Sequence, residues 1–478
     1  MTDSTGSPAS DAAAPPLPAD KPASHGELAR TMGLVSLIIY GVGDMLGAGV
    51  YGLVGKAAGL MGNAVWLAFA GSMVAAMLTG LSYANIGSRY PRAAGAAYVT
   101  HRAYGWPYLS YLVGLAVAAS GLTSMATGSR VIAGFLQTLG LALPAPALVV
   151  LFLLFIAAVV FRGMRESAWL NAICTAVEVG GLMIVIGVGI RYWGSVNYFE
   201  TPPHPDGSAG ALSLTLVLNG AVLTFFSFIG FEDMLNVAEE CKDARRTIPI
   251  ALICALIIGT VIYMAVSITA VSVLHYSELA KSPAALVDVV RKAAPWFPPI
   301  LFTGISIFAV SNTALLNYVM GSRLLYGMSR QGLLPAPLGR VHATRRTPHV
   351  AIGVLLLVVT ALALSGDIRQ LADSTSLLLL GVFCVVNTAL IILKFRDDEP
   401  RGAFEVPAVV PALGVLVCLT LIAARLFGAG ADRKAPLIAG AIGLVITALY
   451  FVLRPKHVVM DDDDHGDGDR DATAQAAA

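Results

Sequence analysis

Twelve long apolar segments constrain this chain more than any other feature of its sequence. Each has about 17 to 27 residues, which is enough for one tilted helix to cross a bilayer. Only helices suit such segments, because backbone polar groups surrounded by lipid must be satisfied within the segment. We therefore predict an all-α membrane protein with twelve transmembrane helices. The predicted spans are residues 34–57, 62–85, 104–130, 144–161, 167–190, 213–236, 248–273, 298–322, 349–365, 372–393, 408–428 and 435–453.

Composition agrees with this class and excludes several others. Hydrophobic residues make up 56% of the chain and charged residues 13%, whereas soluble proteins carry about 25% charged residues. A net charge of +1 gives no indication of a nucleic-acid partner. The eight histidines fall in predicted loops or tails, and neither HExxH, GxSxG nor GxxxxGK[ST] occurs. We therefore expect no enzyme, no nucleotide-driven pump, no metal and no cofactor.

Two polar tails flank the predicted membrane domain of residues 31–456. Residues 1–30 are rich in Ala, Pro, Ser and Asp and have no apolar core, so they are not a cleavable signal peptide. Residues 457–478 contain the acidic run DDDD. We expect both tails to be disordered.

The basic residues predict the orientation of the chain in the membrane. If the N-terminus is inside, 21 of the 31 Lys and Arg residues fall in inside regions and 10 in outside regions. Inside loops are enriched in Lys and Arg, so both termini are predicted to be cytoplasmic. Six arginines in these loops are expected to set the topology and to close an inner gate with Glu239 or Glu240, or else to be solvated. They are Arg89, Arg92, Arg245, Arg246, Arg323 and Arg330.

The first apolar segment contains its own helix breaker. GVGDMLGAGVYG (41–52) has five glycines and an acid, Asp44. The GAG at 47–49 can unwind a helix, and freed backbone groups are tolerated at membrane depth only where they line a cavity. An acid at the bilayer centre costs at least about 2.5 kcal/mol, so Asp44 should also face a polar cavity. Alternatively, the glycines permit close helix packing and the acid is protonated or paired.

The sixth segment shows a matching interruption. FFSFIGFEDMLNVAEE (225–240) has Gly230 near its middle, and Glu232 follows. Interrupted helices in corresponding positions indicate a transporter site formed by inverted repeats.

Several motifs resemble those of the amino acid–polyamine–organocation (APC) superfamily, in particular its cationic amino acid transporters. The resemblance covers about residues 33–455. It implies two inverted five-helix repeats, at about 34–190 and 213–393, with extra helices at 408–453. The motifs are GVGDMLGAGVYGLVG (41–55), SRYPRAAGAAYVTHRAYG (88–105), FFSFIGFEDMLNVAEECKDARRTIPIAL (225–252), SRLLYGMSRQGLLP (322–335) and RTPHVA (346–351).

The resemblance also implies which residues bind the substrate. Amides at the first interruption would bind its carboxylate, aided by the positive end of a half-helix, and carbonyls at the second would hold its ammonium. Asp44 and Glu232 together would suit a cationic group, unless either is protonated. Two phenylalanines are candidate aromatic gates or plain packing. The implied residues are Gly47, Ala48 and Gly49, then Phe226, Ser227, Ile229, Gly230 and Phe231.

Glu178 is the sharpest departure from similar proton-coupled permeases, which carry a lysine at this position. The acid could take up a proton, because an apolar helix disfavours its charged form. It could instead bind Na⁺ with a hydroxyl of Ser311 or Thr313, or simply hydrogen-bond a neighbouring helix.

We predict a secondary active transporter that moves amino acids across the plasma membrane by alternating access and is coupled to protons. Two alternatives are an exchanger of amines, polyamines or cationic amino acids, and a Na⁺-coupled importer. A sensor that binds without transporting is a third. The expected partners are therefore an amino acid or amine, H⁺ or Na⁺, and membrane lipid.

Overall fold

The computed structural model describes residues 32–91, 95–162, 168–203, 210–235, 237–238, 241–330, 334–342, 345, 347–427 and 433–453. Both predicted tails lie outside these residues, as do Arg92, Glu239 and Glu240.

The described residues form the predicted all-α bundle. Ten helical stretches are long and apolar enough to cross a membrane, and two shorter apolar helices, α1 (Leu34–Met45) and α13 (His349–Ser365), accompany them. Each predicted segment corresponds to one helix, except that the first and sixth are divided. The remaining long elements are α2 (Ala48–Met61), α3 (Val65–Arg89), α5 (Pro107–Thr138), α6 (Ala145–Arg162), α7 (Ala168–Gly189), α8 (Leu214–Phe225), α9 (Ala244–Val273), α12 (Pro299–Arg330), α14 (Ile368–Lys394), α15 (Val409–Phe427) and α16 (Lys434–Leu453).

Two predicted boundaries differ from the observed ones for local reasons. The third span does not begin at residue 104, because a separate helix, α4 (Gly95–Tyr104), ends there and α5 begins at Pro107. Proline in the first turn starts a helix without losing a hydrogen bond. The tenth span begins at Ile368 rather than at residue 372, because Asp367 and Gln370 form a capping box before it.

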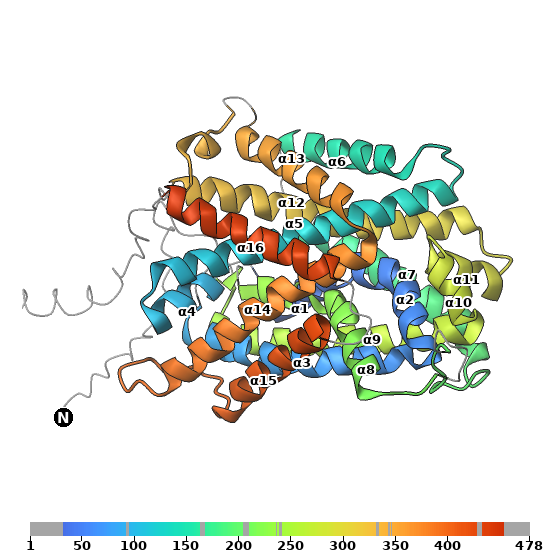
Figure 1. Cartoon of the computed structure of the whole chain (residues 1–478), viewed down its shortest axis with the longest axis horizontal. Helices are drawn as coiled ribbons and strands as arrows, with labels where there is room; N and C mark the ends of the chain where they lie inside the picture. Colours follow the sequence, from blue (N-terminus) through green and yellow to red (C-terminus); the bar gives the residue numbers. More distant parts are fainter. Residues whose placement is uncertain are drawn as a thin grey trace, which may run out of the picture.

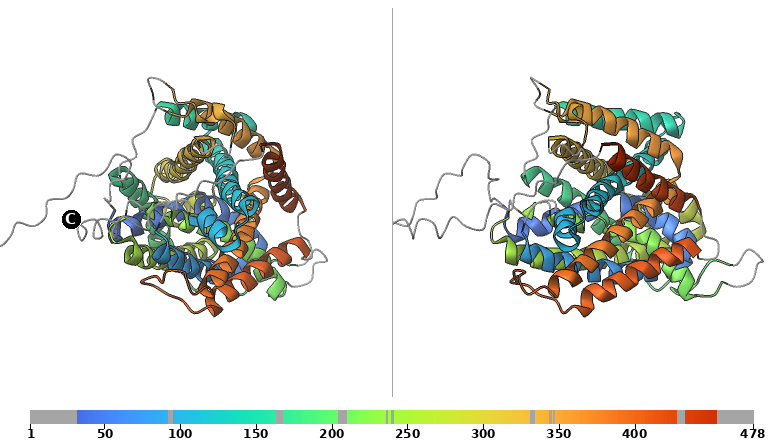
Figure 2. Two further views of the ribbon diagram at one scale, coloured as in Figure 1. Left: turned by 90° about the vertical axis from the view of Figure 1, so that its left-hand side faces the viewer. Right: turned by 60° about the vertical axis from the view of Figure 1, so that its left-hand side comes forward.

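The bundle has two chemically distinct ends. In Figure 1, α4 lies at the left-hand end, and α10 (Tyr276–Lys281) and α11 (Ala285–Ala293) lie at the right-hand end. We call these the Arg89 end and the Lys56 end, after the residues that α3 and α2 place there. The view along the bundle and the oblique view both show α6 and α13 together at its upper edge (Figure 2). The last helix, α16, is peripheral, with Leu437 and Leu444 each 70% exposed.

A buried ion pair joins α15 to α14. Arg425 Nη2 donates to Asp373 Oδ2 at 2.5 Å, and both side chains are 2% exposed. Arg369 lies 3.8 Å from the same carboxylate oxygen. The sequence analysis missed this pair, because both residues lie close to the ends of predicted spans.

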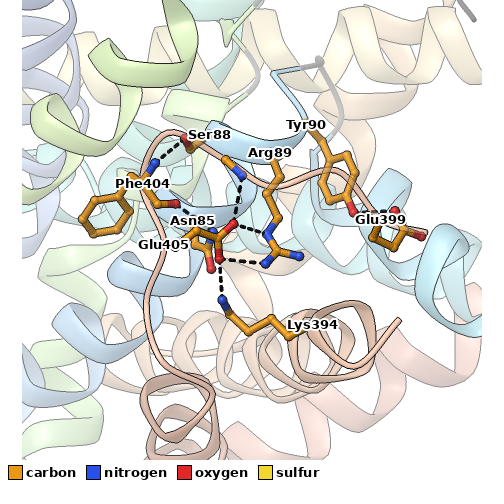
Figure 3. A network of polar contacts seen from close by, with 9 residues as sticks. Asn85, Ser88, Arg89, Tyr90, Lys394, Glu399, Phe404 and Glu405 are labelled. Carbon is orange, nitrogen blue, oxygen red and sulfur yellow. Dashed lines mark hydrogen bonds and ion pairs between the residues drawn. The ribbon is translucent and has the colours of Figure 1, made fainter. Parts of the chain in front are cut away.

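At the Arg89 end, the linker between α14 and α15 is held to α3 by the Glu405 clasp, which comprises Glu405, Arg89 and Lys394. The guanidinium of Arg89 donates to both carboxylate oxygens of Glu405, at 2.6 and 2.7 Å, and Lys394 Nζ donates at 2.6 Å (Figure 3). The backbone N–H of Phe404 donates to Ser88 Oγ at 2.9 Å beside it. Sequence reasoning suggested Glu239 or Glu240 as partners for the inside arginines, whereas Arg89 pairs with Glu405.

A second ion pair extends this contact to α4. Arg102 Nε donates to Glu399 Oε2 at 2.7 Å, and the hydroxyl of Tyr90 donates to the same oxygen at 2.7 Å. Glu399 and Glu405 therefore attach the linker between α14 and α15 to α4 and to α3.

The ionisation of Glu405 follows from these contacts. Burial acts to raise the pKa of Glu405, but the hydrogen bonds from Arg89 and Lys394 outweigh it and lower the pKa to about 2. Such a group stabilises the fold above its unfolded pKa of about 4.3, and this contribution is lost as the pH falls towards about 2.

We predict that Glu405→Gln lowers the melting temperature of the detergent-purified protein by the same amount at pH 5 and at pH 8. Both values lie above the window in which Glu405 titrates. The exposed acid Glu278 at the other end provides the control, and Glu278→Gln should leave the melting temperature unchanged. A decrease seen at pH 8 but absent at pH 5 would contradict the low pKa of Glu405.

Candidate substrate and coupling site

The first transmembrane helix is broken where the glycines predicted it. Residues 46–47 form this first break: α1 ends at Met45, Leu46 is extended with φ −78° and ψ 127°, and α2 begins at Ala48. The N–H groups in the first turn of a helix have no partner within it. Those of α2 therefore face the break with the positive end of its dipole.

The sixth helix is broken at a matching position, over residues 226–230. Here α8 gives way to a 3₁₀ turn (Phe226–Phe228), Ile229 is extended, and a second 3₁₀ turn follows (Phe231–Leu235). Gly230 has φ +120°, a conformation that side chains rarely adopt.

The two breaks lie against each other. A Cβ atom placed on Gly230 would lie 3.0 Å from the backbone carbonyl of Asp44, and one on Gly49 would lie 2.6 Å from the Cα of Ser227. Glycine is therefore required at these positions for backbone-to-backbone contact as well as for flexibility. The helix-packing explanation and the helix-breaking explanation for the glycines both hold here.

Tyr263 of α9 connects the two breaks. Its hydroxyl lies 2.7 Å from the carbonyl oxygen of Met45 and 2.5 Å from that of Ser227, and the ring is fully buried. Thr313 Oγ1 of α12 lies 3.5 Å from the carbonyl oxygen of Leu46. The sequence analysis missed Tyr263, although a tyrosine within an apolar segment usually needs a partner for its hydroxyl.

The two predicted acids lie at the second break. Glu232 Oε2 accepts a hydrogen bond from the N–H of Gly230 at 3.0 Å, so this carboxyl group satisfies a backbone donor that the break has freed. Asp44 is half-buried, and its Cγ would lie 3.1 Å from a Cβ on Gly230.

Ser227 offers an unused polar group nearby. Its Oγ is buried and has no hydrogen-bond partner among the described residues. A Cβ on Gly49 would lie 2.8 Å from this oxygen, which places it beside the start of α2. A buried hydroxyl without a partner costs free energy, so this position favours a polar ligand.

The predicted aromatic residues differ in their surroundings. Phe231 is fully buried and packs against Tyr83 and Phe383, with ring centroids 5.8 and 5.3 Å away. This favours packing over a gate. Phe226 is 4% exposed and lies directly in the second break.

Glu178 of α7 is fully buried between α2 and α12. Its Oε1 accepts from Asn312 Nδ2 at 3.1 Å, while Oε2 has no hydrogen-bond partner among the described residues. The hydroxyl of Tyr51 donates to the Glu178 backbone oxygen at 2.7 Å. The partner on α12 is therefore Asn312, which lies between the half-buried Ser311 and the buried Thr313.

A cavity of about 330 Å³ reaches from the second break to the Arg89 end, and we call it the Glu232 cavity. Its volume lies within the usual range for small-molecule sites. Besides Glu232 it is lined by Ala96, Ala97, Gly114, Val117, Ala118, Ser120, Gly121, Ile229, Asp233, Asn317, Met320, Gly321, Arg323 and Leu324.

A comparison with known protein families also indicates a transporter, as the two broken helices do. The family model for amino acid permeases matches residues 32–449. The chain belongs to the amino acid permease family, within the APC superfamily.

Relatives of this permease have names that refer to different substrates. It is 27% identical over 427 residues to a branched-chain amino acid permease of Bacillus subtilis, covering 84% of this chain and 89% of the relative. It is 28% identical over 462 residues to a methylthioribose transporter of the same organism, covering 91% and 95%. It is 29% identical over 436 residues to the chloroplastic cationic amino acid transporter 9 of Arabidopsis thaliana, covering 85% and 74%. Family membership therefore leaves the substrate of this permease open.

We predict that Gly49→Ala reduces the initial rate of amino acid uptake into proteoliposomes by at least about fivefold, because overpacking against the backbone costs about 1–3 kcal/mol. Gly180→Ala is the matched control, since a Cβ at Gly180 meets nothing within 4 Å. It should stay within about twofold of the wild type. Equal uptake by the two variants would contradict the need for close contact between the breaks.

Proposed function

We propose that this permease is a secondary active transporter that moves amino acids across the plasma membrane by alternating access. The observation that carries the proposal is the contact between two broken helices, one presenting free N–H groups and the other carbonyl groups. The N–H groups of Gly47, Ala48 and Gly49 would bind the carboxylate of the substrate. The carbonyl groups of Phe226, Ser227 and Ile229 would hold its ammonium, and the hydroxyl of Ser227 adds a further polar contact. The carbonyl oxygens of Phe226 and Ser227 already accept one hydrogen bond each, so the ammonium would use their second lone pairs.

The arrangement of the two ends supports access from one side at a time. The Glu232 cavity reaches the second break from the Arg89 end. At the other end, Lys56 Nζ donates to the carbonyl of Ala280 at 2.8 Å, and Gly55 lies against the carbonyl of Leu279. We infer that the Arg89 end is cytoplasmic, because most of the basic residues lie there.

For coupling, we propose that Glu178 carries the proton. It is fully buried, and its Oε2 has no hydrogen-bond partner among the described residues. A carboxylate that is buried without a charged partner costs free energy, and taking up a proton removes this cost for Glu178. A proton bound in one gate state more tightly than in the other links its movement to that of the substrate.

Two other functions each have one observation in their favour. Sodium coupling is supported by Thr313 Oγ1, which lies 3.5 Å from the carbonyl oxygen of Leu46, since hydroxyl and carbonyl oxygens suit a hard cation. A cationic substrate is supported by Asp44 and Glu232, which both lie at the second break.

Uptake by proteoliposomes tests these functions. We expect an amino acid that raises the melting temperature of the purified protein to be concentrated when an inward pH gradient is imposed. We also expect concentration to persist when choline replaces Na⁺. Loss of accumulation in choline would indicate sodium coupling instead. Binding without flux under any gradient would indicate a sensor.

Glu178→Gln mimics the protonated carboxyl group, and we predict that it separates binding from coupling. The variant should bind the same amino acid and exchange it across the membrane, but should no longer concentrate it when a pH gradient is imposed. Glu278→Gln removes an exposed acid and should behave as the wild type. If Glu178→Gln vesicles still respond to the pH gradient, the proton is carried elsewhere.

A further inference from the structure

A second cavity, of about 430 Å³, lies at the Lys56 end, and we call it the basic cavity. Four of its lining residues are basic and one is acidic, an excess of three positive charges. The charged residues are Lys56 of α2, Arg130 of α5, Lys281 of α10, and Asp367 and Arg369 at the start of α14. The uncharged lining comprises Gly52, Ala133, Gly134, Gln137, Ala145, Val149, Ser282, Pro283 and Ile368.

The nearest buried acid does not remove this excess. Asp373 is already paired with Arg425 at 2.5 Å, and Arg369 approaches the same oxygen only to 3.8 Å. The atom that makes this approach is the buried Nε of Arg369, whereas the side chain as a whole is 36% exposed. Part of the Arg369 guanidinium is therefore available to an anion that enters the cavity.

Among the described residues, Lys56 and Arg130 each make one side-chain hydrogen bond. Lys56 Nζ donates to the carbonyl of Ala280 at 2.8 Å, and Arg130 Nε donates to that of Ala363 at 2.5 Å. An ammonium group has three N–H donors and a guanidinium group has five. Both side chains are thus positioned by the protein and keep further donors for a ligand.

The basic cavity lies on the same half-helix as the first break, about 7.5 Å further along α2 from Gly47. Gly52 lines it, and Gly52 is three residues, about one helical turn, beyond Gly49 on α2. A substrate that approaches from the Lys56 end would therefore pass the basic cavity before its carboxylate reaches the N–H groups at the start of α2.

We propose that the basic cavity is an entry vestibule that captures the carboxylate group of the substrate and turns away amines that lack one. The inference rests on the proposed amino acid transport and specifies its substrate class. A cleft lined by charges of one sign concentrates counter-ions about 10- to 1,000-fold and raises their rate of association. Zwitterionic and acidic amino acids are then favoured over cationic ones, and polyamines are the most disfavoured. The acids at the second break act on the ammonium group only after the molecule has entered.

The first experiment compares the electrostatic potential inside and outside the basic cavity, and it does not require transport. Gln137 is exposed and lines the cavity, whereas its neighbour Thr138 is exposed and does not line it. Gln137→Cys and Thr138→Cys would each be reacted with sulfonatoethyl methanethiosulfonate, an anion, and with trimethylammonioethyl methanethiosulfonate, a cation. The ratio of the two rates cancels differences in thiol reactivity, and the wild type gives the background from its five free cysteines.

We expect the anion-to-cation ratio to be about tenfold higher at residue 137 than at residue 138. Adding Lys281→Glu to Gln137→Cys should lower the ratio several-fold, and high salt should reduce it because mobile ions screen the charges. Adding Lys292→Glu, an exposed lysine of the same region that does not line the basic cavity, should leave it unchanged. Equal ratios at the two positions would overturn the proposal.

The second experiment measures selectivity for substrates presented at the Lys56 end. Uptake of labelled glutamine would be competed with glutamate, lysine and putrescine, in wild type, Lys281→Glu and Lys292→Glu. We expect lysine and putrescine to compete relatively better, by about tenfold, only in Lys281→Glu. Unchanged competition in that variant, or wild-type uptake inhibited by putrescine as well as by glutamate, would overturn the proposal. If the wild type takes up no amino acid at all, the proposed function fails, while the cysteine ratios still decide whether the vestibule attracts anions.

Discussion

The hydroxyl of Tyr263, placed between the carbonyl groups of Met45 and Ser227, shows the constraint on which the rest of this structure depends. A helix broken at membrane depth releases backbone groups that lipid cannot satisfy, and each unsatisfied group costs several kcal/mol. The break survives only where another group takes up these donors and acceptors. The single O–H of Tyr263 can donate to either of two carbonyl groups, and the carboxyl group of Glu232 accepts from one N–H group. The backbone groups that remain are those available to a ligand, so the polar surface of the site is defined by what the protein leaves unpaired.

The sequence predicted those parts of the fold that depend on local chemistry. Segment length and apolarity located the spans, and glycines with an adjacent acid located both breaks, because these signals lie within a few residues. The partners of the breaks were not predictable in the same way. Tyr263, Asn312 and the Glu405 clasp approach from segments distant in the sequence. The residues of a single sequence give no information on which helices are neighbours. The partner of Arg89 in particular is 316 residues away in the sequence.

The two cavities differ in chemistry as well as in position. The Glu232 cavity has Glu232 and Asp233 beside the second break and Arg323 elsewhere in its lining, whereas the basic cavity has an excess of positive charge on the α2 side of the first break. An amino acid carries one charge of each sign. The order of charges from one end of the permease to the other therefore matches a molecule that travels with its carboxylate towards α2 and its ammonium towards the second break.

The ion pair between Arg425 and Asp373 has a consequence for how the chain is made. An arginine costs about 2.5–3.5 kcal/mol at the centre of a helix that enters the membrane alone and less towards its ends, and α15 carries Arg425 in its last turn. The acid that neutralises it lies 52 residues earlier, on α14. If α14 leaves the insertion machinery before α15 emerges, Arg425 enters lipid without a counter-charge. The pair therefore favours insertion of α14 and α15 together as one hairpin over insertion of α15 alone.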